Sequence, residues 1–219
     1  VLEAVARNEV LSQVESTNVY NLTPVEYFTA ALITVFLMFA GMPGMKMLVM
    51  ERSYGLTKRI EASPVKLWQV VISKFIVTVI LSIVQFLVII VLTSMVFKNY
   101  WGAPVKNILI LFAGIIFAVS SWSVFVSAIS KTPASADIIG NLSVLLMAMI
   151  GGSIYPLSSM PRFIRTASKF TINRWAMEGF MVIFSGNRGL SVANYFYALI
   201  AIGLTLLLLS TVVIKLRRS

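Results

Sequence analysis

Long stretches without a charged residue alternate along this chain with short polar or basic segments. A helix that crosses the hydrocarbon core of a membrane needs about 20 mostly apolar residues. Five stretches qualify, at residues 27–45, 75–97, 107–130, 138–161 and 189–214. The second of them is apolar on every face, whereas a barrel strand would alternate apolar and polar residues. The pattern therefore predicts an all-α polytopic membrane bundle with five transmembrane helices.

Local signals mark where these helices begin. Thr23-Pro24-Val25-Glu26 has the form of a capping box with Pro at the first helical position. Ser63-Pro64 and Thr132-Pro133 repeat the cap-then-proline pattern before the second and fourth stretches. The turn-forming residues 101–104 predict a hairpin between the second and third helices.

The fourth stretch is less regular than the others, because Gly151-Gly152 and Pro156 lie in its second half. We expect a broken or re-entrant helix there, since irregular backbone at membrane depth is tolerated only against protein or a water-filled cavity. A pair of small residues also allows two helices to pack closely, so both packing and gating stay open.

Composition excludes several classes of protein. The chain of 219 residues is 58% hydrophobic and only 12% charged, with a mean hydropathy of +0.91, which excludes a soluble enzyme. It has no Cys and no His, and its only Asp is Asp137. Thiol, zinc, imidazole and aspartyl-dyad chemistry are therefore excluded. No GxxxxGK[ST] motif occurs, so this chain does not cradle ATP.

The net charge of +10 is read first as a signal for membrane orientation and for contact with anionic lipids, not with nucleic acid. Basic residues are divided almost evenly between the two sides. Those of loop 46–74 and of the C-terminal tail lie closest to helix ends, so we place both in the cytoplasm. The segment 162–188 is then unusually basic for an outside segment.

This orientation puts the N-terminus outside and predicts a further span before Val1, so the five helices would be the last five of six. Residues 1–23 would be the end of an extracytoplasmic domain, and residues 24–219 the transmembrane domain.

The loop 51–64 carries both signs of charge and a short apolar stripe, Leu56 and Ile60, at helical spacing. It predicts a short interfacial helix that ends at Ala62. The loop could serve only to orient the protein. Its acids, Glu51 and Glu61, favour instead a docking surface for another protein, because such surfaces use both signs for register.

Two segments carry motifs with a defined order and spacing. The first has Glu51-Arg52, Gly55, Thr57, Lys58-Arg59, Ser63-Pro64 and Lys74, and the second has Gly151-Gly152, Pro156, Met160-Pro161 and Asn173-x-Trp175-Ala176. These motifs resemble type-2 ABC exporter permeases: the first resembles their cytoplasmic loop, and the second the end of their fifth helix and their external helices. Leu56 separates the usual Gly-Thr pair of the loop, and Ile172 stands where Pro is common.

The resemblance implies a permease subunit in the cell membrane, with a short cytoplasmic coupling helix, short external helices and a cytoplasmic C-terminus. It implies export of a hydrophobic or amphipathic substrate (drug, antibiotic or lipid-like), driven by a separate ATP-binding subunit that holds ATP and Mg. A second permease subunit and membrane lipids would be the other partners. Coupling to the ATPase would fall to Glu51, Arg52, Gly55, Thr57, Lys58, Arg59, Glu61 and Pro64, and an external gate to Gly151, Gly152, Pro156, Pro161 and Glu178.

Glu178 and Asp137 have simpler interpretations than intramembrane chemistry. Glu178 is expected to pair with Arg174, four residues earlier, on an external amphipathic helix. Asp137 follows Thr132 at a helix start and is expected at the surface.

The main alternative function is an ion- or proton-coupled secondary transporter or a channel. Such proteins usually need ionisable side chains deep in the bundle, and the stretches 75–97, 107–130 and 189–214 contain none. An intramembrane enzyme is less favoured still, because the sequence offers no hydrolytic machinery.

Overall fold

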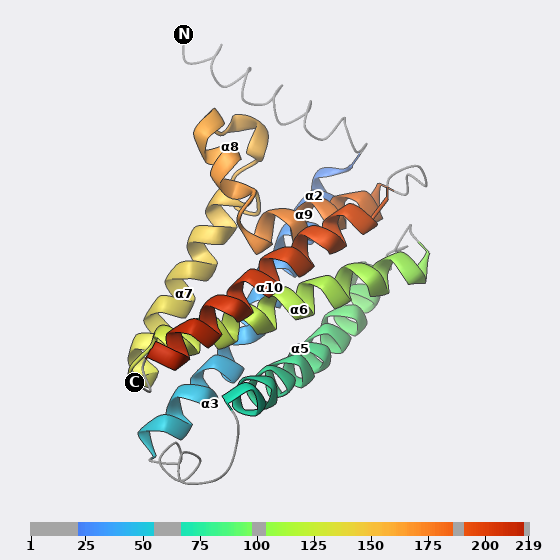
Figure 1. Ribbon diagram of the computed structural model, residues 1–219. Helices are drawn as coiled ribbons and strands as arrows, with labels where there is room; N and C mark the ends of the chain where they lie inside the picture. The colour runs from blue at the N-terminus through green and yellow to red at the C-terminus, as the bar shows by residue number, and fades with distance from the viewer. Residues whose placement is uncertain (1–21, 55–66, 98–103, 186–190, 217–219) are drawn as a thin grey trace.

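The computed structural model describes residues 22–54, 67–97, 104–185 and 191–216, and within these ranges every regular element is a helix (Figure 1). The α-helices are α2 (Pro24–Phe39), α3 (Gly41–Ser53), α5 (Leu67–Phe97), α6 (Val105–Ile129), α7 (Pro133–Ile150), α8 (Arg162–Ser168), α9 (Ile172–Phe184) and α10 (Ala193–Leu216). Among the described residues, five spans are long and apolar enough to cross a membrane, one of which combines α2 with α3. The all-α bundle with five membrane helices is confirmed.

The first span begins as predicted, at the capping box of Thr23. The Thr23 backbone N–H donates to Glu26 Oε2 at 2.8 Å, and the Glu26 N–H donates to Thr23 Oγ1 at 3.3 Å. The span is not one continuous helix over residues 27–45, however. It breaks at Ala40 and then continues as α3 to Ser53. Pro43 explains the break, because its ring has no N–H to donate to the carbonyl of Phe39 and clashes with that carbonyl.

Side chains from two other helices hold this break. Gln85 Nε2 of α5 donates to the carbonyl oxygen of Phe36 at 2.8 Å, and Ser123 Oγ of α6 donates to that of Gly41 at 2.9 Å. The Phe36 carbonyl also accepts from the Ala40 N–H at 3.1 Å, so Gln85 is a second donor there. The two side-chain bonds tie the region of the break to α5 and α6.

Helix α6 is the centre of the bundle and packs against α10, α5, α3 and α9. Its Trp122 and Phe112 are among the largest buried side chains. Small residues let the neighbouring helices approach. A Cβ built on Gly203 of α10 would lie 2.6 Å from a ring carbon of Phe117, so α6 and α10 are in close contact there.

The fourth span ends earlier than its apolar stretch. Helix α7 begins with a capping box of Thr132 and Ser135 and ends at Ile150. Gly152 then has a φ of 98°, a backbone conformation that glycine adopts without strain. The interruption that we expected inside a helix over 138–161 is thus a turn after its end. The chain passes through a short 3-10 helix (Leu157–Ser159) into α8.

Helix α9 then returns into the bundle, where it packs against α2, α6, α7 and α10. Most of its side chains are buried, from Ile172 to Phe184. A short helix was expected at this position, and the structure adds that it is packed between other helices. Charged and polar residues on its first turns suggest exposure, but these groups have partners inside the protein.

Candidate functional site

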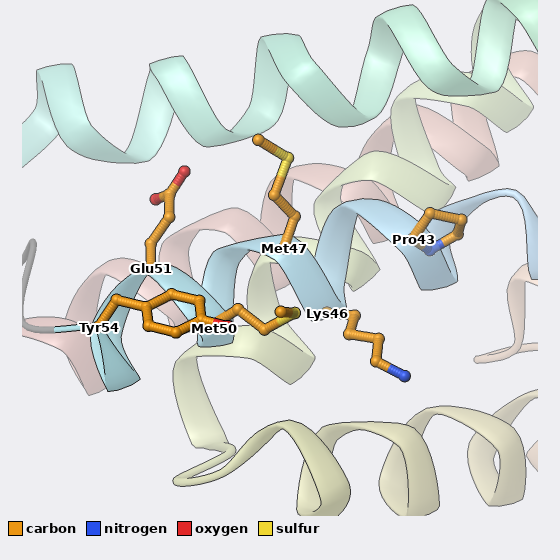
Figure 2. Close-up of a pocket in the computed structure, with 6 residues that line it drawn as sticks. All are labelled: Pro43, Lys46, Met47, Met50, Glu51 and Tyr54. Carbon is orange, nitrogen blue, oxygen red and sulfur yellow. The ribbon is translucent and has the colours of Figure 1, made fainter.

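One face of α3 lines a shallow open groove of about 360 Å³. Its residues recur at helical spacing along that face: Pro43, Lys46, Met47, Met50, Glu51 and Tyr54. Figure 2 shows Met47 and Glu51 pointing toward α5, while Lys46 points the other way. The groove therefore follows the part of the first span beyond its break.

Close contacts on two sides position α3. A Cβ built on Gly44 would lie 2.7 Å from Thr78 Oγ1 of α5, and one built on Gly140 of α7 would lie 2.6 Å from Met45 Cε. Leu48 packs in a separate apolar cluster with Val124 of α6 and Ile214 of α10. The last turns of α3 are thus held next to the end of α10, at the end of the bundle that we call the C-terminal end (Figure 1).

An ion pair joins α3 to α7 at the same end. Lys46 Nζ lies 2.8 Å from Asp137 Oδ2, with side chains 49% and 37% exposed. The surface position expected for Asp137 is confirmed. The sequence did not indicate the partner of Asp137, because Lys46 was interpreted only as one of several charges that orient the protein in the membrane.

The predicted coupling residues are only partly described by the structure. Glu51 and Arg52 lie in the last turn of α3, so they continue the first span and do not open a separate interfacial helix. Glu51 lines the groove and is half-buried. Outside the described residues lie Gly55, Thr57, Lys58, Arg59, Glu61 and Pro64, and with them the expected helix end at Ala62.

At the opposite end of the bundle, the Gly151-Gly152 turn joins three helices. Tyr27 Oη of α2 donates to the carbonyl oxygen of Gly152 at 2.6 Å. Asn173 Nδ2 of α9 lies 2.9 Å from Ser153 Oγ. A Cβ built on Gly151 would lie 2.6 Å from Asn173 Nδ2, which shows how closely the turn and α9 approach. We call these five residues the outer turn cluster.

Sequence reasoning found the two glycines of this cluster and noted Asn173 only as part of a family motif, but it missed Tyr27 and Ser153. Asn173 did carry a signal, because an amide inside an apolar helix needs a buried partner. Pro156 and Pro161 lie just beyond the cluster, where they precede the 3-10 helix and α8.

The predicted pair of Arg174 and Glu178 is confirmed. Arg174 Nε donates to Glu178 Oε1 at 3.0 Å, and its Nη1 donates to the carbonyl of Arg165 and to Ser168 Oγ at 2.8 and 2.7 Å. Burial raises the pKa of Glu178 above its ordinary value, although the Arg174 guanidinium acts in the opposite direction. Arg174 thus connects α8 to α9, and Glu178 accepts a hydrogen bond from Arg174 at this junction.

The chain is similar to known proteins at two levels, a family and a single relative. Residues 6–212 match the family described as ABC-2 family transporter protein. A segment of 96 residues is 27% identical to the linearmycin resistance permease protein LnrN of Bacillus subtilis (strain 168). That segment covers 44% of this chain but only 25% of the length of the relative.

Proposed function

This chain belongs to the ABC-2 family of transporter proteins, and from that premise we propose that it is the permease of an ATP-driven exporter. Its five apolar spans make it a membrane-spanning transporter subunit. The finer proposal is that a separate ATP-binding subunit, which holds ATP and Mg, drives export through a dimer of permease subunits. The second subunit would be another copy or a paralogue.

The position of α3 is the observation that carries the proposed coupling. This helix continues a membrane span beyond its break and leads directly into the predicted docking loop. It is packed against α5, α6 and α7, so a force applied at Ser53 would reach three other spans. The ATP-binding subunit would contact the last turn of α3, including Glu51, and the loop that follows.

The cargo that we propose is hydrophobic or amphipathic, and antibiotic-like. The name of the Bacillus subtilis relative, a linearmycin resistance permease, supports this class. Apolar side chains dominate the described spans, and the α3 groove combines Pro43, Met47 and Met50 with the charged residues Lys46 and Glu51. Apolar spans with a few charges at one end favour cargo that is hydrophobic or amphipathic.

The test of coupling uses Glu51→Gln and a matched control, Glu26→Gln, which removes an acid at the other end of the same span. Gln preserves the capping box at position 26. We expect Glu51→Gln to weaken co-purification of the ATP-binding subunit, sought first in the neighbouring gene, and to lower export per ATP hydrolysed. Glu26→Gln should change neither. Equal behaviour of the two variants would contradict the docking role of α3.

A further inference from the structure

Helix α8 and the residue after it present a row of cations, of which only Lys169 is near an acid among the described residues, Glu178, and without an ion pair to it. Arg162, Arg165 and Lys169 are spaced i, i+3 and i+7, and Lys169 keeps helical dihedral angles, so the three lie along one face. All three are exposed. Within the described ranges none of their side chains forms an ion pair, in contrast to Arg174, which pairs with Glu178. The row is therefore available to an external anion.

Two aromatic rings are exposed next to this row. Phe163 is 74% exposed and Phe170 is 81% exposed. Phe163 lies on α8, and Phe170 lies in the turn after the helix, where its N–H donates to the carbonyl of Ala167 at 3.1 Å. Large exposed rings are unfavourable in water but favourable among acyl chains. Cations have the opposite preference, because a charge in hydrocarbon is costly.

The inner side of α8 is anchored, so these side chains are held outward. Ser168 is buried, and Arg174 bonds both to its hydroxyl and to the carbonyl of Arg165. Trp175 Nε1 donates to the carbonyl of Lys169 at 2.7 Å. Trp175 also lies near Tyr195, with ring centroids 6.3 Å apart. Trp and Tyr gather at membrane interfaces, which is consistent with α8 at that level.

Figure 1 shows α8 beyond the end of α7, at the end of the bundle opposite to the C-terminus. Here an interfacial position satisfies both kinds of side chain, with rings toward the acyl chains and cations toward the headgroups. We propose that α8 is a binding surface for anionic phospholipid headgroups of the surrounding bilayer. Lipid binding would also explain why the segment 162–188 is basic, which the positive-inside rule does not explain.

The test exploits the absence of Cys from the chain. Thr166→Cys, at an exposed position on α8, is labelled with a small fluorophore and the full chain is reconstituted in phosphatidylcholine vesicles. Quenching is then compared for headgroup spin-labelled phosphatidylglycerol and phosphatidylcholine at equal mole fraction. We expect stronger quenching by the anionic lipid, and a preference that weakens with salt.

The test variant is Arg162→Gln with Lys169→Gln, and the matched control is Lys106→Gln with Lys131→Gln, which removes two exposed cations elsewhere. The test variant should lose several-fold of the lipid preference, up to about fivefold per cation. The control should keep it. Arg162→Lys with Arg165→Lys preserves the charge and should also keep it, which separates loss of charge from loss of folding.

Two results would overturn the proposal. Equal quenching by the two lipids in the otherwise unchanged chain would mean that α8 faces water or another protein. An equal loss of preference in the test and control variants would mean that net charge alone attracts the lipid, and not the row on α8.

Discussion

At the residue scale, Tyr27 links the first span to the outer turn cluster through one hydrogen bond. Tyr27→Phe removes the donor to Gly152 and leaves a buried carbonyl without that partner. Leaving such a group unsatisfied costs about 1–3 kcal/mol, so we expect the free energy of unfolding to fall by about that amount. Thermal unfolding in detergent measures the change. Tyr197→Phe, at an exposed position, is the control and should leave the midpoint unchanged.

The Lys46–Asp137 pair should matter for geometry more than for stability. Both side chains are partly exposed, and such pairs contribute at most about 1 kcal/mol. Lys46→Asp would face Asp137 with a second acid and push α3 away from α7, which should lower transport. The exchanged pair, Lys46→Asp with Asp137→Lys, should restore it. Failure of the exchange to restore transport would show that the attraction between these residues is not what positions α3.

At the element scale, the sequence predicted the number and approximate positions of the spans because each long apolar stretch needs a helix in lipid. It did not predict the break at Ala40. Pro43 is visible in the sequence, but the donors that hold the break come from Gln85 and Ser123, which are 49 and 82 residues away from the carbonyls they bind.

The same limit applies to the candidate sites. Asp137 was correctly placed at the surface, yet its partner Lys46 is 91 residues away. Pairs that are close in the sequence were easier to predict. Arg174 and Glu178 are one helical turn apart, so the spacing within a single helix predicts their contact. The burial of α9 could not be predicted in the same way, because Asn173 on this helix binds Ser153, which lies 20 residues away.

The break at Ala40 is expected to depend on Pro43. Pro43→Ala restores an N–H and removes the clash, so we expect α2 and α3 to straighten. Spin labels at Val25→Cys and Tyr54→Cys, both exposed positions at the two ends of the span, measure the change as a longer distance. Pro133→Ala is the matched control, because Pro at a helix start causes no bend. An unchanged distance in Pro43→Ala would show that the contacts from α5 and α6 impose the break alone.

At the scale of the whole molecule, the proposed orientation places the C-terminal end of the bundle in the cytoplasm. Because the chain has no Cys, single substitutions report on each side without background. Tyr54→Cys and Thr166→Cys lie at exposed positions at opposite ends of the bundle. A membrane-impermeant thiol reagent should label Thr166→Cys but not Tyr54→Cys in intact cells, and both in permeabilised cells. The reverse pattern in intact cells would invert the topology.

The position of the break at Ala40 also determines how far the end of α3 moves when this helix rotates. Helix α3 runs from Gly41 to Ser53, and at 1.5 Å per residue it is a lever arm of about 20 Å. Turning this arm by about 10° at Ala40 would displace Ser53 by about 3.5 Å. That displacement is about two-thirds of one helical turn, enough to change which side chains meet across α3 and its neighbours, while α2 and the outer turn cluster stay where they are.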